Sequence, residues 1–509
     1  MSSMTNRAFH RWLLVLWLPL AASAVVIALL RCGAVLDNGA SNSTTAFEDI
    51  SIANVSAIAH GEPAYVDCFS YPYRTSLFNW LFYRTYGAVA RLTAPAPAQL
   101  PTALRLLTFS WVWVGVATTV RLLAPFARGL DAQGGVLIAS FATLTWFGPI
   151  ICWWPWTVRP DLPAIVLEYA AFALVLRSES AGRVAAAGAL FFFAWSFKQN
   201  EVALLAGTVL ALLLGGSWRR ALLLGGVFAV PAGAVLLQAD EAYWLNIAHG
   251  PAVAGWSVDR IWFKVANWLL LGGAYLVVPG VLLAYALSPA ERRDLLKERR
   301  VRMTAAAFAA ALALNLLGSG RQWSACNYYY ESWIIGMTFT GMVTLRAAQT
   351  FTGFGSAWAR NAFVGSVFLL LATCAAYTVA VFVPLDKPYR RTGENLEYAV
   401  RLPRPVFSAA LLAAVKSSPP PLFCDDPLLL VQALDRDAVN HPVIEYTIYL
   451  DALRAGLLRD DDIATRIRNR WFAMVWLEST GSMWEPALQE AGYTPGAVVD
   501  SMRPWMRPP

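Results

Sequence analysis

The amino-acid sequence predicts an all-α polytopic membrane protein with about 11 transmembrane helices. Of its 509 residues, 57% are hydrophobic and only 14% are charged, whereas soluble domains carry about 25% charged residues. The mean hydropathy is +0.48, and apolar runs of the length needed to cross a bilayer recur along the chain. The net charge of +7 comes from basic residues scattered between these runs. These basic residues form no continuous stripe of positive charge, so a nucleic-acid partner is excluded.

The first apolar run, "WLLVLWLPLAASAVVIALL" at 12–30, is long enough to span a bilayer. A cleavable signal peptide is the alternative, because "AASA" resembles a cleavage site. The length of the run and the many later spans favour an uncleaved first helix. The stretch 32–101 that follows contains no run able to cross, and within it the residues 76–92 predict an amphipathic helix along the membrane surface.

Ten further spans are predicted downstream, separated by short loops. They cover 103–124, 135–154, 162–177, 183–198, 200–216, 220–238, 264–287, 302–319, 332–346 and 361–383. Loops on the N-terminal side of this layout are richer in basic residues than those opposite, notably "ERRDLLKERRVR" at 291–302. By the positive-inside rule the N-terminus is cytoplasmic, and the loop 32–101 and the C-terminal tail lie outside.

Hydropathy falls after Pro384. We therefore expect a membrane domain over 1–384 and a soluble extracytoplasmic domain over 385–509, which is large enough for a small core of its own. Within it, 461–478 is predicted as an amphipathic helix and 486–495 as a further short helix.

The six cysteines show no CxxC pair and no Cys/His spacing typical of zinc. Cys32 and Cys68 would both face outward in the predicted topology, where a disulfide is chemically possible. Their irregular spacing favours free or buried thiols instead. The sequence predicts neither a metal site nor a cofactor.

Charged and polar side chains gather in the predicted outer loops, beginning with the adjacent acids Glu48 and Asp49. Ionisable groups at the edge of a bilayer are costly and indicate function. Arginine, lysine and tyrosine hydroxyls suit an anionic phosphate, and a nearby carboxylate suits a general base. The candidates in the later outer loops are Tyr71, Tyr73, Arg74, Arg159, Asp161, Lys198, Glu201, Arg321, Asn327, Tyr328 and Tyr329.

Structural roles are open for several of these residues. Adjacent carboxylates in a loop are often only solvated, and Arg159 with Asp161 suits the start of a helix beside a proline. Lys198 suits a side chain that reaches lipid headgroups, and the tyrosines suit an interfacial belt. The position of Glu168 in the middle of a predicted span favours a structural role, in a buried hydrogen bond, over a role in catalysis.

With these residues in view, the chain resembles the GT-C superfamily of polytopic glycosyltransferases, which includes bacterial aminoarabinose and protein O-mannosyl transferases. "FED" followed by "IANVSAIAHGEPAYVDCF" is similar to the acidic pair of that family and the residues after it. "RPDLPAIVLEYAAF" and "SFKQNEVAL" are similar to a span that begins R-x-D and to a lysine-bearing turn. The likeness covers most of the membrane part, and its motifs are degenerate.

The resemblance implies an inverting sugar transfer from a polyprenyl-phosphate donor to a glycan, lipid or protein acceptor, on the outer face of a bacterial inner membrane. It implies that Asp49, or else Glu48, is the base, although the order Glu-Asp here reverses that of many relatives. Arg74 would meet the donor phosphate, and Arg159, Lys198, Arg321 and the tyrosines after Asn327 would assist. A transporter or lipid flippase remains the alternative, although no internal repeat is visible. A scaffold whose function lies in the tail is a third possibility.

Overall fold

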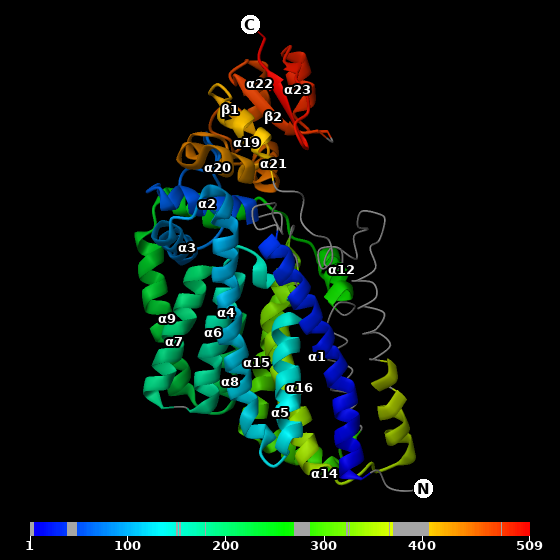
Figure 1. The fold of residues 1–509 in the computed structure, drawn as a ribbon. Helices are drawn as coiled ribbons and strands as arrows, with labels where there is room; N and C mark the ends of the chain where they lie inside the picture. The colour runs from blue at the N-terminus through cyan, green and yellow to red at the C-terminus, as the bar shows by residue number, and fades with distance from the viewer. Residues whose placement is uncertain are drawn as a thin grey trace.

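The structure is a computed structural model, and it describes residues 5–37, 48–148, 151, 154–178, 180–268, 286–321, 324, 326–365, 367–369, 407–479 and 481–508. A bundle of long, roughly parallel helices carries α2 (Glu48–Ala59) and α3 (Trp80–Thr93) across one end, and residues 407–508 lie beyond them (Figure 1). The end of the bundle that meets α2 matters for function, because the candidate residues lie there.

The bundle is formed by the apolar runs of the sequence. Nine of the eleven predicted spans coincide with described helices, and 264–287 and 361–383 fall largely outside the described residues. By length and composition alone, four described stretches could cross a membrane: Asn6–Val26, Pro97–Ala127, Trp218–Gln238 and Arg299–Ser319. The helices are α1 (Asn6–Asp37), α4 (Leu100–Leu123), α5 (Asp131–Phe147), α6 (Asp161–Arg177), α7 (Ala181–Phe197), α8 (Ala203–Leu214), α9 (Trp218–Gln238), α15 (Arg299–Ser319) and α16 (Tyr330–Thr350).

Short elements connect these helices. They are η1 (Pro97–Gln99), η2 (Ala124–Ala127), η3 (Trp154–Trp156), α10 (Glu241–Trp244), the π-helical turn η4 (Leu245–His249), α11 (Gly250–Ala252), α12 (Val258–Trp268), α14 (Pro289–Lys297) and η6 (Cys326–Tyr329). The short helical turns η3 and η6 lie just before α6 and α16, whose first residues include the acids Asp161 and Glu331.

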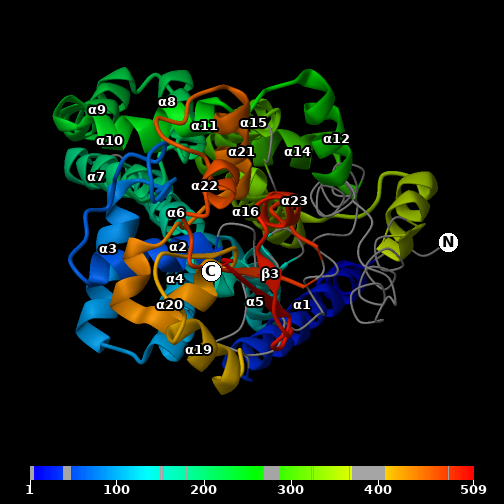
Figure 2. The ribbon, with the colours of Figure 1, turned by 90° about the horizontal axis from the view of Figure 1, so that it is seen from above.

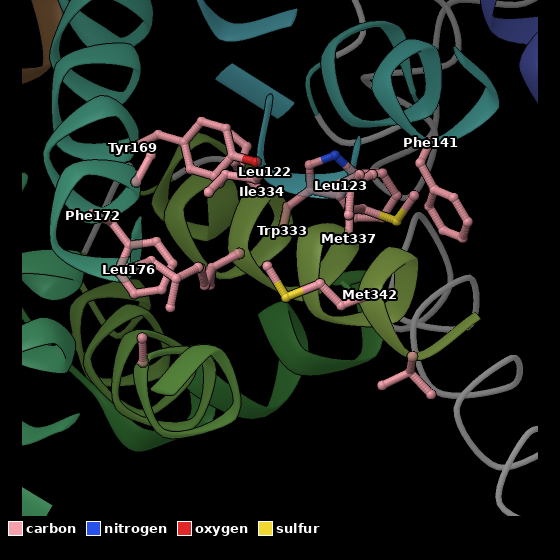
Figure 3. Close-up of a cluster of buried hydrophobic side chains, with 14 of the residues drawn as sticks. Leu122, Leu123, Phe141, Tyr169, Phe172, Leu176, Trp333, Ile334, Met337 and Met342 are labelled. Carbon is pink, nitrogen blue, oxygen red and sulfur yellow. The ribbon is translucent and has the colours of Figure 1, made fainter. Parts of the chain in front are cut away.

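Large apolar side chains of α4, α5, α6 and α16 form the centre of the bundle (Figure 3). Two polar groups among them are paired: the Trp333 indole donates to the Thr145 carbonyl at 3.0 Å, and the Tyr169 hydroxyl lies 2.6 Å from that of Thr338. Glycines bring other helices close together. A Cβ at Gly207 would lie 2.9 Å from the backbone of Ala307, so the backbones of α8 and α15 approach each other closely. Small residues allow such close packing between membrane helices.

The stretch predicted as the first outer loop contains two described helices, α2 (Glu48–Ala59) and α3 (Trp80–Thr93). The predicted amphipathic helix at 76–92 is confirmed as α3, which begins where the Asn79 side chain accepts from the N–H of Trp80. The two helices pack closely, since a Cβ at Gly87 would lie 2.8 Å from the Ile58 side chain. Both lie across the end of the bundle (Figures 1 and 2).

Residues 407–508 contain helices around a four-stranded sheet of order β1-β2-β4-β3. Strand β2 is parallel to β1 and antiparallel to β4. The strands are β1 (Leu422–Cys424), β2 (Met474–Glu478), β3 (Thr494–Pro495) and β4 (Met502–Met506), and the helical elements are α19 (Ala409–Lys416), α20 (Pro427–Leu434), η7 (Asp435–Asn440), α21 (Tyr446–Arg454), α22 (Ile463–Arg468) and α23 (Glu485–Glu490).

The all-α prediction is therefore wrong for the C-terminal part. The segment 461–478, expected as one helix, divides into α22 and β2. Its apolar residues fit a helical period locally, but Val475, Trp476 and Leu477 are buried between strands that come from distant parts of the chain. Long-range strand pairing overrides local periodicity here.

The C-terminal segment packs directly on α2 and on the loop that follows it. Residues of α2, such as Ile52 and Val55, share one apolar cluster with Leu428 and Val431 of α20. The backbone N–H of Val443 donates to the Pro72 carbonyl at 3.2 Å. Because this contact buries apolar surface of both parts, the two are expected to fold and move together.

The cysteines of the described residues are not bridged. Cys32, Cys68 and Cys424 are free thiols, which confirms the favoured interpretation over a Cys32–Cys68 disulfide. Cys68 is buried against Phe69, Leu245 and Ala452.

Candidate functional site

Glu48 opens α2 and is fully buried in an ion pair. Its carboxylate accepts two hydrogen bonds from the guanidinium of Arg105, each 2.9 Å long, and neither side chain is exposed. The N–H of Val158 donates to the same carboxylate at 2.8 Å. Glu48 thus fastens the start of α2 to α4 and to the loop before α6, and its charge is already balanced.

Asp49, the next residue, is half-buried and differently placed. One of its oxygens accepts a hydrogen bond from the N–H of Ile50 at 3.0 Å, and among the described residues it has no ion-pair partner. Burial, together with the negative charge of Asp426 on the facing segment, raises the pKa of Asp49 to about 8. A carboxylate with this pKa is suited to accept a proton near neutral pH.

Arg159, Asp161 and Lys198 form a buried charged network at the end of the bundle. The Asp161 carboxylate lies 2.7 Å from the Lys198 ammonium and 3.3 Å from the Arg159 guanidinium. The Asn327 amide donates to it at 2.8 Å. Lys198 also pairs with Glu201. Residues from three separate loops therefore converge.

Aromatic rings surround the cations of this network. The Arg159 guanidinium lies 4.5 Å from the centre of the Trp154 ring and 5.3 Å from that of Phe78, and the Lys198 ammonium lies 5.8 Å from the Tyr328 ring. Cation–π contacts of this kind hold a charge in place without neutralising it.

Arg74 lies beside this network, on the loop between α2 and α3. Its guanidinium donates to the Pro63 carbonyl at 2.7 Å, and its side chain is 4% exposed. The Tyr83 hydroxyl interacts electrostatically with both Arg74 and Arg159. Arg74 and Arg159 thus share a neighbour, but no direct contact joins either of them to Asp49 among the described residues.

Four of the other predicted residues lie elsewhere or have structural contacts. Tyr71 and Tyr73 direct their hydroxyls to backbone carbonyls of the C-terminal segment, at Asn440 and Asp461, so they hold that segment against the first loop. Tyr329 is buried beneath the loop, close to Ser319. Arg321 forms an isolated β-bridge with Trp256 and, among the described residues, contacts no member of the network.

Three buried glutamates lie immediately next to Lys198. Glu168, Glu201 and Glu331 can bring one carboxylate oxygen each within 4.8 Å of one another. Glu331 accepts from the N–H groups of Ala203 and Leu204 at the start of α8, at 2.8 and 3.2 Å, and from the Asn315 amide at 2.7 Å. No amide, hydroxyl or cationic group in the described part of the chain donates to either oxygen of Glu168, and the carboxyl group of Glu331 is its hydrogen-bonding neighbour.

The sequence analysis missed three residues of this region. Arg105 gave no local signal, because its partner Glu48 is 57 positions away. Asp426 was detectable only as a helix start before Pro427, where it accepts from the N–H groups of Leu428 and Leu429. Tyr83 belongs to the predicted amphipathic helix, and nothing in that pattern distinguishes it from a core aromatic residue.

Comparison with known proteins identifies the fold. No protein-family model and no curated protein sequence matches the chain. Among solved structures, ArnT from Cupriavidus metallidurans bound to undecaprenyl phosphate is similar over 95% of this chain and 97% of that one, with 13% sequence identity and a TM-score of 0.55. Its apo form gives 0.56 at the same identity and coverage. The predicted GT-C type of fold is thereby confirmed.

Proposed function

We propose that the protein is an inverting membrane glycosyltransferase that moves a sugar from a polyprenyl-phosphate donor to an acceptor of the cell envelope. The observation that carries this proposal is the convergence of Arg159, Asp161, Lys198 and Asn327 from separate loops, beside an α2 whose Asp49 forms no ion pair with the described residues. The GT-C fold, shared with a protein solved with undecaprenyl phosphate, supports it.

In this proposal the cations hold the donor phosphate. Arg159 and Lys198 already lie in one network, and Arg74 and Arg159 both act electrostatically on Tyr83. Fixed cations in a site with little water stabilise the negative charge that grows on the phosphate as the sugar leaves. The isoprenoid tail would lie along the apolar side chains of the bundle.

Asp49 is the proposed base. It takes the proton of the acceptor hydroxyl while the acceptor oxygen forms a bond to the anomeric carbon of the sugar. The bond between that carbon and the phosphate oxygen breaks, and the electron pair leaves with the polyprenyl phosphate. Attack from the side opposite the phosphate inverts the anomeric centre. Glu48 is less suited to this role, because Arg105 already occupies both of its oxygens.

The proposal includes the membrane layout predicted from the sequence. Eleven spans with a cytoplasmic N-terminus put α2, α3 and the C-terminal domain over 385–509 on the outer side of a bacterial inner membrane. The charged network at the α2 end of the bundle then faces that side. Cysteine accessibility labelling at exposed positions of α14 and of the C-terminal segment would test the orientation.

The function is tested by mass spectrometry of envelope glycans, lipids and lipid-linked sugars in a strain that lacks the gene. Loss of one sugar from an envelope component, with accumulation of its polyprenyl-phosphate donor, is the expected result. If every envelope sugar were still attached, but a small molecule or lipid were depleted on one side of the membrane, the result would indicate a transporter or flippase instead.

The pH dependence of the reaction should reflect the raised pKa of Asp49. Because a base must be ionised to accept a proton, we expect kcat/KM to rise as the pH increases through about 8. Asp426→Asn removes the neighbouring negative charge and should move this rise to lower pH, while asparagine still begins α20 well. A profile that is identical in both proteins would contradict the assignment of Asp49.

Binding of the donor phosphate should depend on Arg159. We expect Arg159→Gln to weaken the binding of a short-chain polyprenyl phosphate by about 10- to 100-fold, which corresponds to one lost charged hydrogen bond. Binding of the matching polyprenol, which has no phosphate, serves as the control and should not change. Equal losses for both ligands would mean that Arg159 only maintains the fold.

A further inference from the structure

We propose that Glu168, Glu201 and Glu331 bind one divalent cation. The three side chains come from α6, from the turn before α8 and from α16, and they are 0%, 5% and 3% exposed. Their carboxylate oxygens approach within 4.8 Å of one another. Three carboxylates gathered at this spacing without water need positive charge among them, since like charges in a dry interior repel strongly.

Glu168 provides the second observation. It is fully buried, and neither of its oxygens receives a hydrogen bond from an amide, hydroxyl or cationic group of the described residues. Buried polar atoms in proteins almost always have a partner. Its neighbours Glu201 and Glu331 are carboxyl groups as well, so within the described residues only a proton shared with Glu331 would join Glu168 to a partner.

The charges of the neighbourhood do not balance. Asp161 and the three glutamates carry four negative charges when ionised, and Arg159 and Lys198 are the cations that contact this set in the described part of the chain. Two negative charges are therefore left unbalanced, and one divalent cation would balance them. Lys198 itself bonds to Glu201 and Asp161, so it is not free to approach Glu168.

The donor set selects the kind of cation. Three carboxylates and no histidine or thiol suit the hard ions Mg²⁺, Ca²⁺ and Mn²⁺. Oxygens of Glu331 that already accept from the start of α8 and from Asn315 are held in place, as is usual for metal ligands with supporting hydrogen bonds. The bound ion would tie α6, α8 and α16 together next to Lys198.

The test uses the full-length protein in detergent, stripped with a chelator and titrated with Mn²⁺ or Ca²⁺ alone. We expect one Mn²⁺ per chain by electron paramagnetic resonance, competed by Ca²⁺, and a rise of the thermal unfolding midpoint with ion concentration. Glu168→Gln should weaken binding at least about 100-fold, because it removes a ligand of the ion. Glu490→Gln makes the same chemical change on an exposed helix and should bind normally.

Absence of binding in the folded wild-type protein would overturn the proposal and assign the missing charge to protons on the glutamates. Binding that is unchanged in Glu168→Gln would place the ion elsewhere and would also overturn it. If that variant does not fold, Glu201→Gln tests the same ligand set. None of these measurements requires sugar transfer, so the result does not depend on the proposed reaction.

Discussion

Asp49→Asn is expected to reduce sugar transfer by about 100- to 10,000-fold, the usual contribution of a general base. Asparagine has nearly the same shape and can still accept the hydrogen bond from Ile50, but it cannot take a proton. The fold should remain intact, because Asp49 is half-buried and makes no ion pair among the described residues. Transfer is measured in the deletion strain carrying the variant, as the ratio of modified acceptor to accumulated donor.

Asp259→Asn is the matched control, since Asp259 is an exposed carboxylate at the start of α12. It should transfer sugar at the wild-type rate. Near-normal transfer by Asp49→Asn would remove Asp49 as the base. If Glu48→Gln were inactive at wild-type stability in the same experiment, the role would pass to Glu48.

Glu48→Gln is expected to destabilise the protein by about 3–5 kcal/mol, the usual result of breaking a buried ion pair. The variant deprives the buried Arg105 of its carboxylate partner, and both side chains are 0% exposed. Denaturant or thermal unfolding of the purified protein measures the loss. Activity should fall because less protein is folded, so the activity of each folded molecule is the quantity to compare with that of Asp49→Asn.

A double-mutant cycle tests whether the pair itself is responsible. Arg105→Gln alone should destabilise the protein to a similar extent. The double variant should lose much less unfolding free energy than the sum of the losses in the two single variants. Glu490→Gln breaks an exposed ion pair with Arg468 and should leave the unfolding midpoint unchanged, because such pairs contribute little. Additive losses would show that Glu48 and Arg105 act independently.

The structure also changes how the C-terminal part can be studied. Deleting 385–509 would distinguish a scaffold from an enzyme only if the rest kept its shape. Tyr73 and α2 share apolar clusters with that part, so its removal exposes the core of the first loop and moves Asp426 away from Asp49. Point variants such as Asp426→Asn are therefore the better test.

Much of the bundle was predictable from composition alone. Apolar runs must form helices in a bilayer, because every backbone polar group needs a partner within its own segment. For that reason the helices α1, α4 to α9, α15 and α16 appear where the hydropathy predicts them. The sheet of the last hundred residues was not predictable, because its strands pair over long distances and local periodicity gives no sign of the partner.

The sequence by itself determined which chemical groups are available at the end of the bundle: two adjacent acids, a row of cations and a buried glutamate, each marked by the cost of charge near lipid. Only the tertiary structure decided how they are used. It neutralises Glu48 with Arg105, leaves Asp49 under the influence of Asp426, joins Asp161 to Lys198, and gathers Glu168 with Glu201 and Glu331. The physical reason is that pairing of charges depends on distance in space, and residues far apart in the chain supply the partners.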